Sequence, residues 1–151
     1  MRLTRHTDFA LRLLIHLSLS PGRRASAVEI ARAFGISVDH LRKVVQELVS
    51  TGLVRTHRGR GGGVELVCDP DTLTVGDVVR RMEGPIQVMQ CLSDPTDCRL
   101  TPACRLRRGL QKAQTAFMDV LDGLTIAGCT DSAEEARRLL GIPFARMTAA
   151  Q

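Results

Sequence analysis

Apolar side chains recur at helical spacing through the first fifty residues of the chain. In residues 4–19 they lie three and four positions apart, which predicts an amphipathic helix. Its inner stripe holds Phe9, Ala10, Leu13, Leu14 and Leu17, with His16 on the same face. Residues 38–50 repeat the pattern, and their inner stripe is Leu41, Val44, Val45 and Leu48.

A shorter helix is predicted between these two. Ser26 and Glu29 have the spacing of a capping box, and Gly35 suits the left-handed residue that ends a helix. Ser37 can then cap the helix over residues 38–50. A short helix, a glycine-containing turn and a second helix with a polar outer face form a helix-turn-helix.

A β-hairpin is expected directly after the helix-turn-helix. Residues 54–56 and 64–67 can pair as short strands, and the glycines between them supply the backbone freedom that the loop requires. A hairpin in this position is a wing. Thr74 and Asp77 then begin a short helix that ends near Glu83.

The second half of the chain has a different pattern. Residues 84–101 show neither helical nor strand periodicity. Thr101 and Pro102 have the residue types of an N-cap and a first helical position, and they predict a helix from Pro102 to about Leu124. Apolar residues recur along it at alternating gaps of four and three, as in a coiled-coil seam that pairs with another helix. The seam is Leu106, Leu110, Ala113, Phe117, Val120 and Leu124.

Basic residues are concentrated in the first half of the chain. Residues 1–67 contain eleven Lys and Arg and five Asp and Glu, a net charge of +6, whereas residues 68–151 contain ten and eleven, a net charge of −1. Such asymmetry is typical of a domain that binds a polyanion, of which nucleic acid is the first candidate. The absence of Tyr and Trp disfavours single-strand or RNA platforms, which stack bases on aromatic rings.

The candidate DNA contacts lie on the outer face of the helix over residues 38–50 and in the wing. Arg, Lys and Gln side chains can donate to base edges or phosphates in a major groove. Arg58 and Arg60, among the glycines of the wing, can follow the negative potential of a narrow groove. An ordinary solvated face and a plain flexible hairpin are the alternatives. The helix candidates are Ser37, Asp39, His40, Arg42, Lys43 and Gln46.

These patterns predict a mainly α fold with a small β-hairpin wing, a winged helix-turn-helix followed by a long dimerisation helix. We divide the chain into a DNA-binding domain at residues 1–67, a short helix and cysteine-bearing loop at 68–101, a dimerisation helix at 102–126, and a C-terminal tail with a short helix at 127–151.

Other function classes are disfavoured. The wing loop "RGRGGG" lacks the lysine-serine/threonine ending and the strand-loop-helix context of a phosphate-binding loop. No nucleophile–base pair or carboxylate pair stands out, so we do not expect an enzyme. Nowhere do about 18 apolar residues run together, and the N-terminal residues do not form a signal sequence. We therefore expect a soluble cytoplasmic protein with no membrane partner.

Three of the five cysteines, Cys91, Cys98 and Cys104, lie in "CLSDPTDCRLTPAC". They lack the close pairs of a structural zinc site, whereas iron–sulfur clusters take thiolates at wider spacing. We expect Cys104 at the third position of its helix, where free amides favour a thiolate. A redox-switch disulfide and ordinary loop thiols stay open. Cys68 and Cys129 are expected as buried structural cysteines.

In their order, these motifs resemble the winged-helix iron–sulfur regulators, the family that contains NsrR and IscR. "RLTRHTDFALRLLIHL" is similar to their first helix, "IARAFGISVDHLRKVVQELVSTGLV" to their helix-turn-helix, "RGRGGG" to their wing and "CLSDPTDCRLTPAC" to their three-cysteine loop. The resemblance covers residues 1 to about 125. The gap between Cys91 and Cys98 is a residue or two longer than is usual in the family. The resemblance implies a homodimeric transcription regulator whose long helices cross-pair.

The resemblance also implies the ligands of an iron–sulfur cluster, 4Fe–4S in preference to 2Fe–2S. The IscR type uses a histidine shortly after the third cysteine, and "RLRRGLQKAQ" has none. The NsrR type uses an aspartate in the first helix of the other subunit, and Asp8 matches it. By itself, Asp8 is a carboxylate favoured by the helix dipole. The implied ligands are Cys91, Cys98, Cys104 and Asp8 of the partner subunit.

By this resemblance the protein is a nitric-oxide-responsive repressor. It binds palindromic double-stranded operator DNA as a homodimer and releases the DNA when the cluster is nitrosylated. Two alternatives stay open: an iron- or redox-responsive regulator of the same family, and a small electron-transfer iron–sulfur protein.

Overall fold

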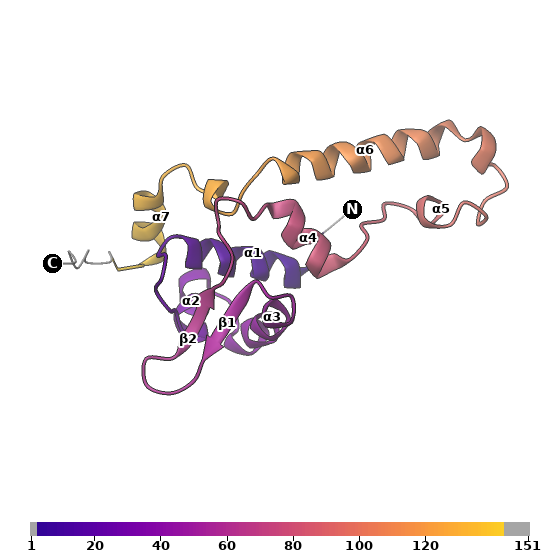
Figure 1. Ribbon diagram of the computed structural model, residues 1–151. Coiled ribbons are helices and arrows are strands. Elements are labelled where there is room, and N and C mark those ends of the chain that lie inside the picture. The colour runs from indigo at the N-terminus through magenta and orange to yellow at the C-terminus, as the bar shows by residue number, and fades with distance from the viewer. Residues whose placement is uncertain (1–2, 144–151) are drawn as a thin grey trace.

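The structure is a computed structural model that describes residues 3–143, and it consists of a head and a projecting arm (Figure 1). We call the arm the long helix α6 together with the segment 84–104 that runs beside it. The head contains α1 (Arg5–Ser18), α2 (Ala27–Phe34), α3 (Val38–Ser50), β1 (Val54–His57), β2 (Gly63–Leu66), α4 (Val75–Glu83) and α7 (Ala133–Leu140). The arm contains α5 (Gln90–Ser93), the 3₁₀ turn η1 (Thr101–Ala103) and α6 (Arg105–Asp122), and a second 3₁₀ turn, η2 (Ala127–Cys129), leads back to α7.

Helix α1 lies at the centre of the head, where it contacts α2, α3 and α4. The side chains of its predicted stripe at Ala10, Leu13 and Leu14 are fully buried. Burying a leucine side chain contributes about 1.5–3 kcal/mol, so this stripe holds the three surrounding helices together. Among the described residues, no helix is long and apolar enough to cross a membrane.

The helix-turn-helix forms as predicted, with two differences at its caps. Gly35 ends α2 in the left-handed conformation, with φ of 63°. The Ser26 hydroxyl accepts the Glu29 N–H, but the Glu29 carboxylate pairs with Arg23 Nη1 at 2.7 Å, and this contact draws it away from a complete capping box. Ser37 precedes α3 as expected, but its side chain makes no capping hydrogen bond.

The wing is an antiparallel hairpin of β1 and β2, in which Val54 lies opposite Leu66. Each strand differs from its predicted range by one residue at one or both ends. An isolated bridge between Ala25 and Val64 attaches β2 to the segment before α2. A Cβ on Gly63 would come within 2.8 Å of the Ala25 carbonyl oxygen, so this close approach requires glycine.

The start of the long helix differs from the prediction. Thr101, Pro102 and Ala103 form the separate 3₁₀ turn η1, because Cys104 adopts an extended conformation that interrupts the helix. Cys104 is therefore the N-cap of α6, and the prediction that placed it at the third helical position was wrong. At the other end, Leu124 lies outside α6, since its carbonyl oxygen accepts the Val75 N–H at the start of α4.

The remaining elements of the second half are small. Thr74 and Asp77 form the complete capping box of α4, which ends at Glu83 as predicted. The segment 84–101, in which no periodicity was found, contains the single helical turn α5. The predicted tail helix is α7, capped by Ser132 and ended by Gly141. Residues 144–151 of the predicted tail lie outside the described residues.

Candidate DNA-binding surface and cysteine centre

The outer face of α3 is available for contact with a partner. Its inner stripe is fully or almost fully buried, and that burial fixes which face of the helix points outward. The six predicted contact residues, Ser37, Asp39, His40, Arg42, Lys43 and Gln46, are all exposed. Arg42 and Asp39 pair at 3.1 Å, and both members are well exposed, so this pair contributes little stability.

The wing presents two exposed arginines, Arg58 and Arg60, in the loop between β1 and β2. The base of the wing contains a polar contact that the sequence pattern did not predict. Glu65 Oε2 on β2 is 2.6 Å from His57 Nε2 on β1 and 3.8 Å from Arg24 Nε. These contacts stiffen the base of the wing, and the cross-strand register that places residues 57 and 65 near each other is the signal for them.

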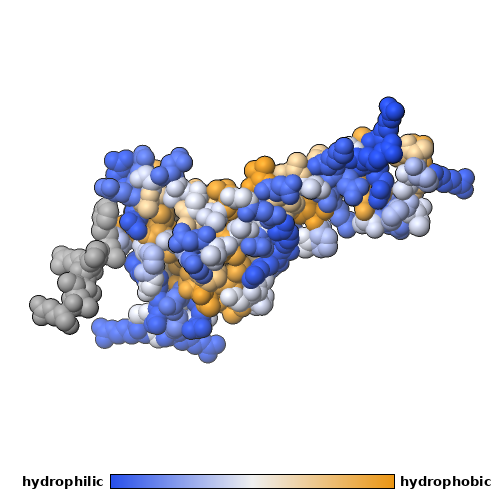
Figure 2. Space-filling model, turned by 45° about the horizontal axis from the view of Figure 1, so that its top comes forward, coloured by the Kyte–Doolittle hydropathy of each residue, from blue (hydrophilic) through white to orange (hydrophobic). Residues whose placement is uncertain are grey.

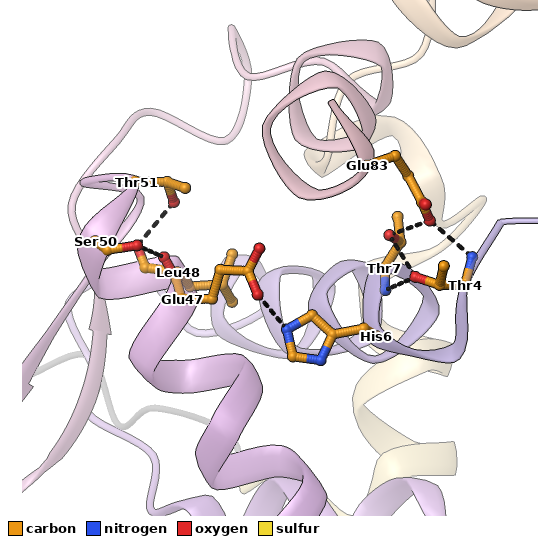
Figure 3. A network of polar contacts seen from close by, with 8 residues as sticks. All are labelled: Thr4, His6, Thr7, Glu47, Leu48, Ser50, Thr51 and Glu83. Carbon is orange, nitrogen blue, oxygen red and sulfur yellow. Dashed lines mark hydrogen bonds and ion pairs between the residues drawn. The ribbon is translucent and has the colours of Figure 1, made fainter. Parts of the chain in front are cut away.

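Asp8 lies in the first turn of α1 and pairs with Arg12, with Nε of Arg12 2.9 Å from Oδ1 of Asp8. The spacing of four residues on one helix is the sequence signal for this pair. The turn that carries Asp8 is held in place on two sides. His6 Nε2 on α1 is 2.6 Å from Glu47 Oε2 on α3. Figure 3 shows this pair, and it shows Glu83 at the end of α4 beside Thr4 and Thr7.

Glu83 is the anchor between α1 and α4. Its Oε1 accepts hydrogen bonds from the Thr4 N–H at 2.7 Å and from the Thr7 hydroxyl. Partial burial opposes ionisation, but these hydrogen bonds outweigh it and lower the pKa of Glu83. Seventy-six residues separate Thr7 from Glu83, so local sequence patterns do not reveal the contact.

The three predicted cluster cysteines lie on the arm. Cys91 belongs to α5 and is half-buried, Cys98 is exposed, and Cys104 caps α6. The Cys104 Sγ accepts the Arg107 N–H at 3.3 Å, and Arg107 Nε donates to the Cys91 carbonyl oxygen at 3.0 Å. All three thiols are free, so the structure contains no disulfide between them.

The donor set fits an iron–sulfur cluster in its chemistry. Three free thiols, one of them already accepting an amide hydrogen bond, are the soft ligands that such clusters take. Within the described residues, no group of three His, Cys, Asp or Glu side chains gathers closely enough to hold a single metal ion. Cluster thiolates bind different iron atoms and lie farther apart than the ligands of one ion.

Asp8 and the three cysteines lie in different parts of one chain. Asp8 is on α1 in the head, whereas α5 and the start of α6 lie at the tip of the arm, remote from the head (Figure 1). A site that combines them therefore needs a second copy of the chain.

Helix α6 has no buried residue, although it is amphipathic. Of the predicted seam, Leu106 is 63% exposed and Val120 is 72% exposed. Ala113 and Leu124 are also exposed, and Leu110 and Phe117 are partly buried. Apolar side chains are visible along the surface of the arm, and hydrophilic residues project from its outer end (Figure 2). A second helix on this seam would remove this apolar surface from water.

The two other cysteines are partly buried and pack against the core of the head. Cys68 Sγ donates to the Leu53 carbonyl oxygen and Cys129 Sγ to that of Thr125. Burial raises the pKa of both thiols, which makes them poor thiolate donors. They are structural, although less buried than expected.

The chain is similar to known transcription regulators. It is 38% identical over 142 residues to the HTH-type transcriptional regulator NsrR of Shouchella clausii, a match that covers 93% of this chain and 95% of the relative. The solved structure of IscR from T. potens superposes with a TM-score of 0.68 at 25% identity, covering 91% of each chain. That of CymR, the global cysteine regulator of B. subtilis, superposes with a TM-score of 0.63 at 30% identity, covering 85% of this chain and 95% of CymR.

The chain is mainly helical with one antiparallel hairpin, and its superposition on these winged-helix regulators confirms the predicted fold class. The model of the Rrf2 family, described as iron-dependent transcriptional regulators, matches residues 3–131. The chain belongs to the Rrf2 family of transcriptional regulators.

Proposed function

We propose that the protein is a homodimeric, nitric-oxide-responsive repressor that holds an iron–sulfur cluster and binds palindromic operator DNA. The observation that carries the proposal is the separation of Asp8 from the three cysteines within one chain, together with an uncovered apolar seam on the helix between them. A second copy paired on that seam supplies the aspartate that the three cysteines of a single chain lack. The similarity to proteins named NsrR supports nitric oxide as the signal.

DNA binding is supported by charge and exposure. The first 67 residues carry a net charge of +6, and the exposed polar face of α3 and the two wing arginines lie within them. In a two-fold dimer the two α3 helices enter successive major grooves roughly 34 Å apart, which demands a palindromic site. The division into a DNA-binding domain at 1–67 and a dimerisation helix at 102–126 is part of this proposal.

The ligands of the cluster are proposed to be Cys91, Cys98, Cys104 and Asp8 of the partner subunit. A carboxylate is a hard ligand among soft thiolates, so a 4Fe–4S cluster held this way has one weakly held iron. When bound, the cluster supplies iron that reacts with nitric oxide. The longer gap between Cys91 and Cys98 is accommodated in a loop, where extra length costs little.

Asp8 is coupled to the recognition helix through contacts of the head. Its turn of α1 is joined to α3 by His6 and Glu47, and to α4 by Thr7 and Glu83. Arg81 Nη1 of α4 in turn donates to the carbonyl oxygen of Thr51, the C-cap of α3, at 3.2 Å. When Asp8 is released from the partner's cysteine arm, the constraint on the spacing of the two α3 helices is lost. A coupling free energy of about 1.4 kcal/mol changes operator affinity tenfold.

An iron- or redox-responsive regulator of the same family is the second candidate. The exposed, free Cys98 favours it, since an accessible thiol can be oxidised without a cluster. The similarity to CymR, named the global cysteine regulator of B. subtilis, supports the same class. A small electron-transfer protein is the third candidate, and binding to duplex DNA with a steep salt dependence would exclude it.

One anaerobic experiment tests the proposal. Operator duplexes are selected from random DNA by the reconstituted protein, and nitric oxide is titrated while visible absorption and duplex affinity are followed together. We expect affinity to fall at least tenfold as the absorption changes. Cys98→Ser should abolish the absorption, and Cys129→Ser is the matched control that should retain it. Unchanged affinity during the reaction with nitric oxide would contradict the proposal, and release by peroxide from iron-free protein would favour the thiol switch.

A further inference from the structure

Arg107 contacts two of the three cysteine residues of the arm. Its Nε donates to the Cys91 carbonyl oxygen at 3.0 Å, a contact that crosses from α6 to α5. Its backbone N–H donates to the Cys104 Sγ at 3.3 Å and closes the first turn of α6. One residue therefore joins the main chain of Cys91 to the helix end that Cys104 caps.

The same face of α6 holds the cysteine-bearing segment at a second point. Gln114 Oε1 accepts the Val88 N–H at 3.3 Å. Arg107 and Gln114 are seven residues apart, which is about two helical turns, so they lie on one face of α6. The apolar seam uses other positions, and its Leu106 and Val120 stay exposed. The segment around residues 88–91 is thus attached along the polar face beside the seam.

Arg107 differs from its neighbours in the sequence. It is half-buried, whereas Arg105 and Arg108 are exposed. A hydrogen bond from a charged donor is stronger than one from a neutral donor, and a guanidinium keeps its charge. Residues that support metal ligands from the outside fix their orientation and change the affinity for the group that they bind.

We propose that Arg107 is a positioning residue of the cysteine centre, an inference that rests on the function proposed above. It sets Cys91 relative to Cys104 before a cluster is bound, so less conformational freedom is lost when the cluster enters. Its positive charge, held at the main chain of Cys91, would also favour the binding of an anionic cluster.

The first experiment uses the full-length chain without a cluster. Hydrogen exchange is measured at the amides of residues 88–93 in the wild type, Arg107→Ala, Arg107→Lys and Arg108→Ala. We expect Arg107→Ala to raise exchange about tenfold, the change that a loss of 1.4 kcal/mol produces. Arg107→Lys should restore part of the protection, and Arg108→Ala should match the wild type. The substitutions keep the amide that donates to Cys104, so helix content should be unchanged.

The second experiment uses protein reconstituted anaerobically with iron and sulfide. A chelator should bleach the visible absorption of Arg107→Ala about tenfold faster than that of the wild type. The visible circular dichroism of the cluster should also change, which a purely structural loss elsewhere in the fold would not produce. Arg107→Lys should lie closer to the wild type, and Arg108→Ala should be indistinguishable from it.

The outcomes separate the two proposals. A wild-type chain that takes up no cluster would overturn the proposed function and this inference together. If the wild type holds a cluster and Arg107→Ala matches it in exchange, bleaching and dichroism, only the role of Arg107 is overturned. Equal effects of Arg107→Ala and Arg108→Ala would show that general charge acts, and would also overturn the specific role.

Discussion

The guanidinium of Arg12 lies between the carboxylate of Asp8 and the ring of Phe34. Its Nε is 2.9 Å from Asp8 Oδ1, and its Cζ is 5.9 Å from the centroid of the Phe34 ring at the end of α2. Asp8 and Arg12 are both about half-exposed, so their pairing contributes only about 0.3–0.5 kcal/mol to stability. In a single chain Asp8 therefore has a partner that it would have to share or give up to serve as the proposed iron ligand.

Replacing Asp8 with Ala tests its proposed role as a ligand. We expect Asp8→Ala to lose the cluster to a chelator at least tenfold faster, because the cluster then keeps only three protein ligands and one of its iron atoms has none. The free energy of unfolding of the cluster-free chain should change by less than about 0.5 kcal/mol. The measurements are visible absorption under anaerobic conditions and urea denaturation.

Arg12→Ala is the matched control for that substitution, since it removes the same ion pair but keeps the carboxylate. The cluster of Arg12→Ala should be as stable as that of the wild type or more stable. If both variants lose the cluster equally fast, the ion pair and not ligation by Asp8 explains the result.

Substitution on α3 should weaken DNA binding without affecting the fold. Lys43 is exposed, and Lys43→Ala should raise the Kd for selected operator duplexes about tenfold at moderate salt. If Lys43 contacts a phosphate, the slope of log affinity against log salt should fall by about 0.9. Lys112→Ala, an exposed lysine of the arm, should leave affinity unchanged. An equal loss in both variants would indicate a general charge effect and contradict recognition by α3.

A charge placed on the apolar seam should prevent dimerisation. Val120 is exposed in the single chain, so Val120→Glu should keep the monomer folded while burying a carboxylate in the proposed interface. We expect sedimentation to show monomers at concentrations where the wild type is a dimer, together with weaker operator binding. Thr115→Glu, at an exposed position off the seam, should remain dimeric. If Val120→Glu remained a dimer, the interface would lie elsewhere on the chain.

His16 should make stability depend on pH. It is buried against Phe34, and neither ring nitrogen has a hydrogen-bond partner among the described residues. Burial lowers the pKa of His16, an effect that Glu29 opposes and Arg23 reinforces. Because the unfolded state then binds the proton more readily, the contribution of His16 to stability is lost as the pH falls below about 6.5.

His16→Leu should remove this pH dependence. We expect a smaller fall in the free energy of unfolding between about pH 7.5 and about pH 5.5, and stability at the higher pH equal to the wild type or up to about 1 kcal/mol greater, because an unpaired polar group leaves the core. Denaturant unfolding at both values measures the change. The exposed His40→Gln provides the comparison, and an unaltered pH dependence in His16→Leu would assign the effect to another group.

Local patterns were sufficient to predict the helices of the head. Gly35 ends α2, Thr74 begins α4 and Ser132 begins α7, each by hydrogen bonds to residues within one turn. Such contacts depend on neighbours in the chain, so they can be read from spacing alone. The exposure of the predicted site residues on α3 could also be read from local spacing, because the buried stripe determines which face of the helix points outward.

Predictions failed where a side chain or backbone group had more than one available partner. Thr101 and Pro102 have the residue types of a helix start, yet α6 begins after Cys104, whose sulfur accepts an amide and whose neighbouring segment is held by Arg107. Glu29 has the spacing of a capping box, yet its carboxylate pairs with Arg23. In each case the group contacted the partner that the folded chain placed within reach, and the residue types alone do not say which partner that is.

The residue types and their periodicity were thus enough to indicate a winged helix-turn-helix, a long helix with an apolar seam and a loop that holds three cysteines. Tertiary structure alone decided that Glu83 anchors the turn carrying Asp8, that Arg107 joins Cys91 to the start of α6, and that Asp8 lies in the head while the cysteines lie on the arm. Helical periodicity arises from interactions over three or four residues, whereas the contacts of Glu83 and Arg107 join positions up to 79 residues apart and exist only once the core has packed.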